Sequence, residues 1–163
     1  MKYSGIIKDD VNNGEGIGLT FFTQGCPHHC KGCQNPETWN PTGGFEYNET
    51  ILNKIVEYFK TKTYATRLTL SGGDPICSPD IVLPLCKAVK QVRPDVVIWL
   101  YTGYIYEEIQ NNPILQYVDV LIDGPFILEK RDITLPFRGS NNQRIINVPL
   151  SKEKGVTTLY YPS

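Results

Sequence analysis

The sequence lacks the features of a membrane protein, of a secreted protein and of a nucleic-acid-binding protein. Its longest apolar run covers residues 96–101, far short of the roughly 18 residues that span a membrane. The first residues contain no apolar h-region, so we expect no secretory signal and a cytoplasmic location. Basic residues number 16 and acidic residues 17, and the net charge of −1 predicts no general attraction to nucleic acid. We therefore expect neither a membrane nor a nucleic acid among the partners.

Internal repeats, low-complexity tracts and linkers are also missing, and a chain of 163 residues fits one domain, residues 1–163. That length is too short for a complete eight-unit barrel of strands and helices, which needs about 250 residues. Apolar residues make up 40% of the chain and charged residues 20%, as is typical of a globular protein. One hydrophobic core is therefore expected.

The periodicity of apolar residues alternates between the patterns of strands and of helices. We expect helices beginning near Asn48 and Ser78, a weaker helix at 104–110, and strands at 18–23, 67–71, 96–101, 118–122 and 144–148. Residues 126–142 are polar and read as irregular. This alternation predicts an α/β fold with a mainly parallel sheet, which five strands would build as an open partial barrel.

Polar or glycine-rich turns follow four of these strands: a cysteine-containing loop, then residues 72–74, 102–103 and 123–124. Parallel sheets bind their ligands at the carboxyl-terminal ends of the strands. The four turns therefore predict a ligand site on one rim of the sheet.

The five cysteines are an odd number, and in a chain without a signal peptide we do not expect them to form a disulfide framework. Three of them, Cys26, Cys30 and Cys33, lie within eight residues, a spacing at which thiolates gather around one soft metal centre. A structural zinc site and an electron-carrier cluster both need four protein ligands. The fourth ligand could be His28, His29 or Cys77, or its position could be left open for a small molecule.

The radical S-adenosylmethionine enzymes carry a cluster motif that resembles Cys26-x3-Cys30-x2-Cys33. In those enzymes three cysteines hold a [4Fe-4S] cluster, and the remaining iron binds the amino and carboxylate groups of S-adenosyl-L-methionine. Their glycine-rich turn, which binds the methionine part of that cofactor, is similar to Ser71-Gly72-Gly73-Asp74-Pro75. By this resemblance Gly72 and Gly73 allow the backbone to approach closely, and Asp74 accepts from the cofactor's ammonium.

A closer resemblance is to the activating proteins of the anaerobic (class III) ribonucleotide reductases, and it extends from about residue 14 to residue 146. It rests on the cysteine loop and three further segments: Trp99-Leu100-Tyr101-Thr102-Gly103-Tyr104, Val120-Leu121-Ile122-Asp123-Gly124-Pro125-Phe126 and Arg138-Gly139-Ser140-Asn141-Asn142-Gln143-Arg144. One stretch departs from the pattern. Related activating enzymes tend to have Asp-Gly-Pro-Gly followed by an arginine, whereas this chain has Asn13-Gly14-Glu15-Gly16-Ile17, which leaves the role of the stretch open.

The resemblance implies an activating enzyme that forms a 5′-deoxyadenosyl radical and installs a glycyl radical on its partner, the large subunit of the anaerobic ribonucleotide reductase. An electron donor such as flavodoxin would reduce the cluster. No general base is needed, so the lack of a Ser-His-Asp or paired-carboxylate arrangement is no objection. The three cysteines would act as iron ligands, and Gly72, Gly73 and Asp74 would contact the cofactor. Gly32, Cys33 and Gln34 should also approach the cofactor, because they form or adjoin a cluster ligand. Thr102 and Asp123 end strands on the same rim, where contacts to the cofactor's ribose or to a substrate loop are expected.

Other interpretations stay open at this point. They are an activator of another glycyl-radical enzyme such as a formate lyase, a radical enzyme acting on a small molecule, and a zinc-stabilised binding module. Because a part-barrel leaves its rim open and the chain has no second domain as a lid, we expect a protein segment as substrate.

The remaining chemically notable residues receive more ordinary interpretations. His28 and His29 are expected to be exposed loop residues, Cys77 a small loop residue and Cys86 part of the core. Arg138 and Arg144 could order the C-terminal segment, contact a partner or be solvated.

Overall fold

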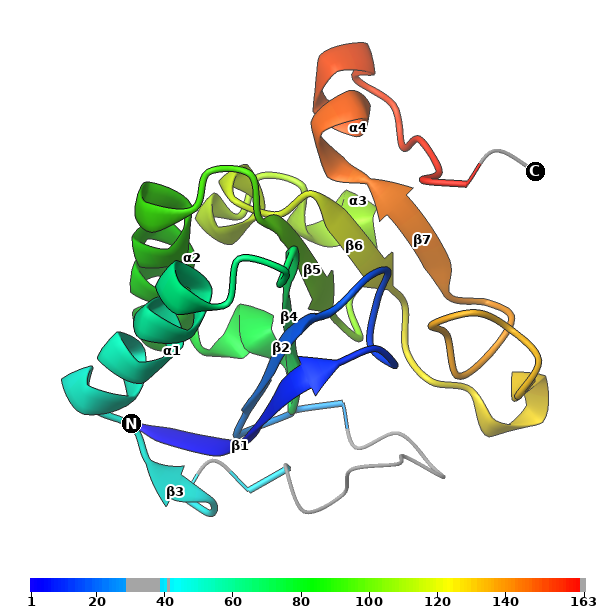
Figure 1. The fold of residues 1–163 in the computed structure, drawn as a ribbon. Coiled ribbons are helices and arrows are strands. Elements are labelled where there is room, and N and C mark those ends of the chain that lie inside the picture. Colours follow the sequence, from blue (N-terminus) through cyan, green and yellow to red (C-terminus); the bar gives the residue numbers. More distant parts are fainter. Residues whose placement is uncertain (29–38, 41, 162–163) are drawn as a thin grey trace.

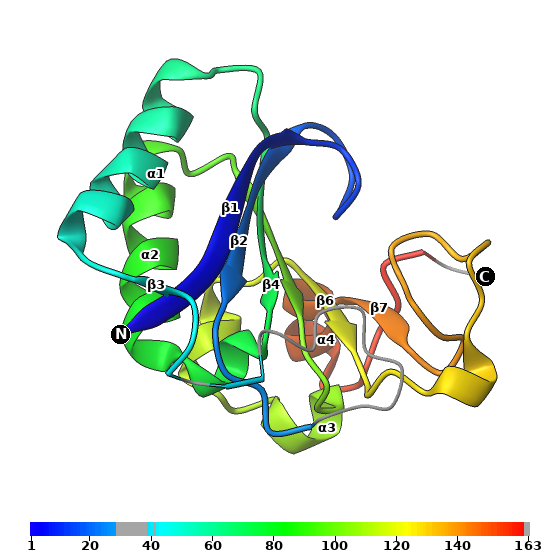
Figure 2. The same cartoon turned by 90° about the horizontal axis from the view of Figure 1, so that it is seen from below.

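A computed structural model describes residues 1–28, 39–40 and 42–161, which form one sheet with helices packed against it (Figures 1 and 2). The strand order is β3-β1-β2-β4-β5-β6-β7. The strands are β1 (Lys2–Asp10), β2 (Gly18–Thr23), β3 (Phe45–Glu46), β4 (Arg67–Gly72), β5 (Val97–Tyr101), β6 (Val120–Asp123) and β7 (Arg144–Asn147). The α-helices are α1 (Glu49–Thr61), α2 (Pro79–Val92), α3 (Tyr106–Ile109) and α4 (Val148–Lys154), and short 3₁₀ helices are η2 (Pro75–Cys77), η3 (Pro113–Gln116) and η4 (Leu128–Lys130).

The centre of the sheet is parallel, and its edges are antiparallel. Strands β2, β4, β5 and β6 pair in parallel, whereas β1 pairs antiparallel with β2 and β3, and β7 pairs antiparallel with β6. The predicted α/β class and all five predicted strands are confirmed, with ends shifted by up to two residues. The sequence pattern missed β1 and β3, and the last strand reverses the direction expected of a mainly parallel sheet. The described strands form an open sheet with β3 and β7 at its edges.

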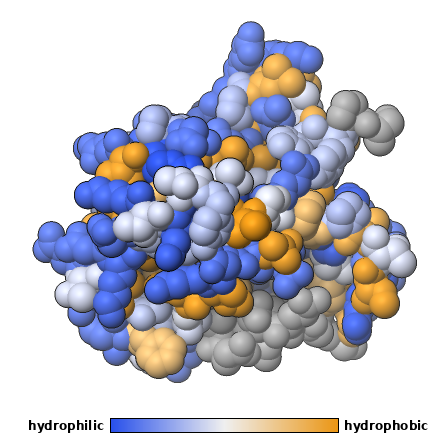
Figure 3. Space-filling view, in the orientation of Figure 1, coloured by the Kyte–Doolittle hydropathy of each residue, from blue (hydrophilic) through white to orange (hydrophobic). Residues whose placement is uncertain are grey.

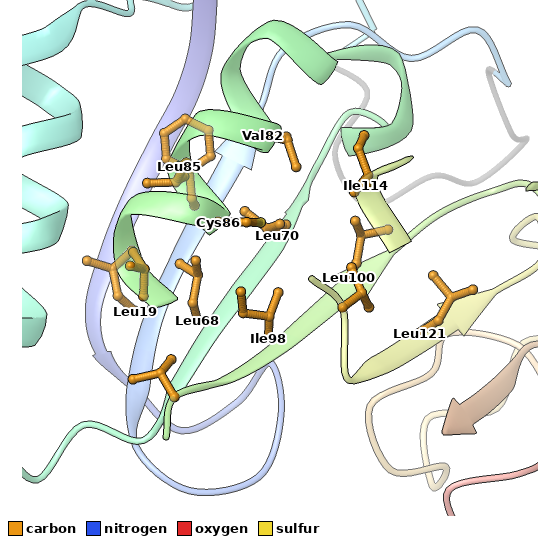
Figure 4. Close-up of a cluster of buried hydrophobic side chains, with 14 of the residues drawn as sticks. Leu19, Leu68, Leu70, Val82, Leu85, Cys86, Ile98, Leu100, Ile114 and Leu121 are labelled. Atoms are coloured by element: carbon orange, nitrogen blue, oxygen red, sulfur yellow. The ribbon is translucent and has the colours of Figure 1, made fainter. Parts of the chain in front are cut away.

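The face of the sheet covered by α1 and α2 carries the main hydrophobic core (Figure 4). The side chain of Asn48 accepts a hydrogen bond from the Ile51 N–H and so begins α1. Helix α2 begins with Pro79 and buries Cys86 along one side, as the sequence predicts. Burial raises the pKa of the Cys86 thiol to about 12, so this cysteine stays protonated inside the core.

The opposite face of the sheet has a smaller core, formed by Trp99, Val120, Ile122 and Ile145. The ring of Phe137 packs edge-on to Trp99 with ring centroids 5.2 Å apart, and Tyr160 does the same at 5.8 Å. Residues far apart in the sequence, from the 126–142 segment and from the C-terminal segment, therefore cover this face.

The stretch 13–17, whose role the sequence left open, folds over a buried arginine. The guanidinium of Arg67 donates to the carbonyl oxygens of Glu15 and Gly16 at 3.2 and 3.0 Å, and it pairs with Asp10. Gly14 lies so close that an added Cβ would be 2.5 Å from the Arg67 side chain. Burial lowers the pKa of Arg67, and these carbonyl and carboxylate oxygens compensate for its lost hydration. The stretch therefore closes the turn between β1 and β2 and packs on the sheet.

The surface shows small groups of hydrophobic side chains among hydrophilic ones on the face drawn in Figure 3. Within the described ranges, every helix is too short or too polar to cross a lipid bilayer.

Candidate functional site

The carboxyl-terminal ends of the parallel strands meet around one hollow of about 140 Å³. Its lining includes predicted site residues from three different turns: Cys26, Gly72, Gly73 and Thr102. The register of the sheet explains this meeting, because Thr23 at the end of β2 pairs with Gly72 at the end of β4. The strand ends that the sequence predicts as a ligand site thus form a concave surface, and ligand binding there stays a prediction.

The two glycines of the turn after β4, Gly72 and Gly73, allow this turn to pack directly against the backbone that follows β2. The Gly73 N–H donates to the Thr23 carbonyl at 2.9 Å, and the Asp74 N–H donates to the Gly25 carbonyl at 2.8 Å. An added Cβ on Gly73 would be 2.2 Å from the Gly25 oxygen. Gly72 has φ +96°, and its added Cβ would collide with the Thr23 backbone. The sequence predicts that a ligand approaches these two glycines closely. In the structure the backbone at the start of the cysteine loop approaches them closely.

Asp74 is completely buried, and its carboxylate is occupied by groups of the protein. It accepts from the Ile76 N–H at 3.1 Å, which begins η2, and from the Gly103 N–H at 3.0 Å. The Thr102 hydroxyl donates to both carboxylate oxygens, at 3.0 and 2.9 Å. Asp74 thus joins the turn after β4 to the turn after β5, while its predicted contact to a cofactor ammonium stays a prediction.

His28 differs from the expectation of an exposed loop residue. Its side chain is only 17% exposed, and its Nε2 lies 2.6 Å from Asp74 Oδ2. The ring is edge-on to Tyr104 with centroids 4.6 Å apart. The hydrogen bond that the His28 ring donates to the Asp74 carboxylate raises the pKa of His28 above its usual value. The exposed interpretation was wrong because the partner carboxylate lies 46 residues away in the sequence.

Asp123, predicted to contact a ligand or a substrate loop, is buried at the end of β6. Its carboxylate accepts from the Tyr106 N–H at 2.7 Å and from Arg144, at 3.1 Å from Nε and 2.5 Å from Nη2. Arg144 also pairs with Glu107 at 2.6 Å, and this contact lowers the pKa of Glu107 to about 2. Arg144 is therefore held by two carboxylates of the protein rather than simply solvated, while Arg138 donates to the Gln143 carbonyl.

The segments 123–126 and 138–144 are separate in the sequence but lie together as one wall beside the hollow. The Gln143 side chain accepts from the N–H groups of Gly139 and Ser140 and donates to the Gly124 carbonyl at 3.0 Å. A second hollow of about 290 Å³ lies along this wall and shares part of its lining with the first, namely Ser71, Tyr101, Phe126 and Gln143. The two hollows therefore adjoin one another, and we refer to them together as the groove, which begins at Cys26.

The cysteine loop is described at its two ends. Cys26 is partly buried, and its N–H donates to the Trp39 carbonyl at 3.2 Å. Four predicted site residues and the second histidine lie outside the described residues: Cys30, Gly32, Cys33, Gln34 and His29. Within the described residues no three histidine, cysteine or carboxylate side chains meet as a metal site.

Cys77, one of the candidates for a fourth ligand, lies in η2 and is exposed. It lines a different hollow from the one at Cys26, and its Sγ is 3.8 Å from the Tyr104 hydroxyl. Although the residue as a whole is exposed, partial desolvation of the sulfur, together with the nearby charge of Asp74, raises the pKa of the Cys77 thiol. This position favours the interpretation of Cys77 as a small residue in a turn.

Known proteins resemble this chain over most of its length. Residues 12–146 match the family described as a 4Fe-4S single cluster domain. The anaerobic ribonucleoside-triphosphate reductase-activating protein of Haemophilus influenzae is 42% identical over 150 residues, 89% of this chain and 97% of the relative. Proteins of the same name from Vibrio cholerae and Enterobacteria phage T4 are 43% and 38% identical, over 89% of this chain and over 97% and 93% of their own lengths.

The fold is α/β, and a cysteine loop follows the carboxyl-terminal end of one of its parallel strands. Together with the match to a 4Fe-4S single cluster domain, this arrangement indicates an iron–sulfur protein. More particularly, the chain belongs to the family of anaerobic ribonucleoside-triphosphate reductase-activating proteins. The resemblance to the activating proteins of the anaerobic ribonucleotide reductases is thereby confirmed.

Proposed function

We propose that this protein is a radical S-adenosylmethionine enzyme that installs a glycyl radical on an anaerobic ribonucleotide reductase. The observation that carries the proposal is the groove that begins at Cys26, where the cysteine loop lies directly on the Gly72–Gly73 turn. A loop with three thiolates therefore adjoins a backbone surface able to receive a polar ligand. We take the sheet to be the described part of the open barrel typical of that superfamily.

The residues present fit an iron–sulfur cluster with one iron left for the cofactor. Cys26, Cys30 and Cys33 are three soft ligands, whereas Cys86 is sealed in the core and Cys77 lines another hollow. When bound, the cluster and S-adenosyl-L-methionine supply a one-electron cleavage that yields methionine and a 5′-deoxyadenosyl radical able to take hydrogen from a glycine.

The chain itself binds and orients these groups and excludes water. Gly72 and Gly73 expose backbone to the hollow, and Thr102 adds its own surface beside them. Asp74 does not line the hollow, and its hydrogen bonds to Thr102 and Gly103 fix the shape of the two turns. We assign Asp74 to the support of the turn first, and to an ammonium contact second.

The partner would be the large subunit of the reductase, and the substrate a glycine-bearing segment of it. The groove continues from Cys26 past Tyr101 and Phe126 into the second hollow, whose lining of aromatic and polar side chains is open to a chain segment. A glycine has no side chain to keep its α-carbon away from the reacting group. A small electron-carrier protein such as flavodoxin is the reductant we expect, in the cytoplasm.

The test is anaerobic reconstitution followed by incubation with the reductase, S-adenosyl-L-methionine and a reductant. We expect about four iron atoms per chain and a glycyl-radical signal in electron paramagnetic resonance (EPR) only when all components are present. Bound zinc in place of iron, or a radical on a formate lyase but none on the reductase, would contradict the proposal. Rapid turnover of a small metabolite without any protein partner would contradict it as well.

A further inference from the structure

Asp74 holds the cysteine loop on both sides of Cys26. On the side that precedes Cys26, the Asp74 N–H donates to the Gly25 carbonyl at 2.8 Å. On the side that follows, the Asp74 carboxylate lies 2.6 Å from Nε2 of His28. Both attachments come from one completely buried residue, so the stretch 25–28 is fastened at two points to the turn after β4.

The segment Tyr101-Thr102-Gly103-Tyr104, which helped to identify the family, forms the seat of the His28 ring. Thr102 fixes the carboxylate that receives the imidazole, and the Tyr104 ring packs edge-on to it. Gly103 leaves the space that the imidazole fills, because an added Cβ would lie 2.5 Å from His28 Cδ2. Three consecutive residues after β5 thus position the side chain of a histidine in the cysteine loop.

We propose that His28 is a positioning residue, which fastens the Cys26 end of the cluster-binding loop to the strand ends that form the cofactor site. The proposal rests on the proposed function for the nature of the metal group. A side chain that orients a metal ligand from outside the coordination sphere alters how firmly the metal is held. His28 would therefore set the retention of the cluster and its placement relative to the Gly72–Gly73 backbone.

The experiment compares His28→Ala and His28→Gln with the wild-type protein, each reconstituted anaerobically as the full chain. For His28→Ala we expect iron to be lost to a chelator about 10-fold to 100-fold faster. We also expect a smaller change in the EPR spectrum of the reduced cluster when S-adenosyl-L-methionine is added. Glutamine can still donate a hydrogen bond to Asp74, so His28→Gln should lose iron at close to the wild-type rate.

A matched control is Asp119→Asn at the opposite end of the sheet. Asp119 is also a carboxylate with several partners, since it accepts from Lys90 at 3.0 Å and from the Ile98 N–H at 2.9 Å. Its substitution should lower the melting temperature and leave the rate of iron loss unchanged. Equal acceleration of iron loss in Asp119→Asn and His28→Ala would overturn the proposal, because general destabilisation would then explain both.

The Gly103→Ala variant tests the seat of the imidazole independently. In the wild-type background the new methyl group displaces the ring, so iron loss should accelerate as in His28→Ala. In the His28→Ala background the space is empty, and the same substitution should add no further acceleration. Additive effects of the two substitutions, or a wild-type rate for His28→Ala, would overturn the proposal.

Failure of the proposed function would look different. If the wild-type protein takes up zinc instead of iron, or if S-adenosyl-L-methionine leaves the cluster spectrum unchanged, the proposed function fails. The fastening of the loop is then still decided by the rates at which the same variants lose their metal.

Discussion

Leu70, inside β4, and Asp74, just beyond the end of that strand, are both completely buried, but different interactions surround them. Leu70 belongs to a core of aliphatic and aromatic side chains between the sheet and helices α1 and α2. Asp74 makes directed hydrogen bonds to groups from three separate turns. The helix-covered core is thus held by contacts that many residues share, and the strand-end rim by a few polar groups with fixed geometry.

This difference determines how each region responds to change. A core of many similar contacts loses stability in proportion to the volume removed and keeps its arrangement. A rim built on single hydrogen bonds and close backbone contacts loses its shape when one of them is broken. The rim, which carries the proposed function, should therefore tolerate few substitutions. The core, which supplies stability, should tolerate more of them.

The largest effect is expected from cysteine substitutions at the rim, and the matched substitution in the core should have little effect on activity. Cys26→Ala, like Cys30→Ala or Cys33→Ala, removes a proposed iron ligand and should abolish cofactor cleavage. Cys86→Ala removes a buried thiol far from the groove and should retain cleavage, with a loss of stability of about 1 kcal/mol. Product methionine measured by chromatography checks both. Cys77→Ala should also retain cleavage, and loss of the cluster in that variant alone would favour an all-cysteine electron carrier.

The next effect is expected from Gly73→Ala. Its Cβ would be 2.2 Å from the Gly25 oxygen, so the start of the cysteine loop must move. We expect reduced iron content after reconstitution, rather than an intact cluster with weaker cofactor binding. Gly5→Ala is the matched control, because an added Cβ there meets nothing within 4 Å. A Gly73→Ala protein with full iron content would show that the rim adapts as the core does.

A smaller effect, confined to stability, is expected from Leu70→Ala in the core. Removal of a buried leucine side chain should lower the free energy of unfolding by about 2–5 kcal/mol. The folded fraction should still take up iron to the wild-type ratio. Denaturant unfolding and iron analysis of the same sample check the two statements. Ile133→Ala, whose side chain is 84% exposed, serves as control and should change stability by no more than about 0.5 kcal/mol.

The smallest effect concerns the ion pair of Glu107 with Arg144 and its dependence on pH. The pKa of Glu107 is lowered from 4.5 to about 2 in the folded protein, chiefly by the hydrogen bond from Arg144. Its stabilisation is therefore complete above pH 4.5 and is lost as the pH falls towards 2. Because the Glu107 side chain is 46% exposed, solvent screening limits the contribution to about 1 kcal/mol or less. Unfolding of Glu107→Gln should depend less on pH in this range, and an unchanged pH profile would assign the acid sensitivity to other groups.

The elements with strong patterns of their own could be predicted from the sequence. Helices α1 and α2 show an apolar stripe at helical spacing, and β2, β4 and β5 show short apolar runs. Each of these patterns is visible in the element's own residues, without knowledge of its partners. Strand β1 could not be found in this way. It is half-exposed, it contains Gly5, and it forms because β2 offers an unpaired edge beside it.

For the site, the sequence by itself determined the cysteine spacing, the family and the order of the turns along one rim. Only the tertiary structure decided that Asp74 supports two turns and that His28 forms a hydrogen bond with it. It also decided that the Arg67 guanidinium binds the carbonyl oxygens of the stretch 13–17. Patterns along the chain record which residues repeat at helical or strand intervals. The partners of a buried charge are instead chosen by the pairing register of strands that lie tens of residues apart, and that register exists only once the sheet has formed.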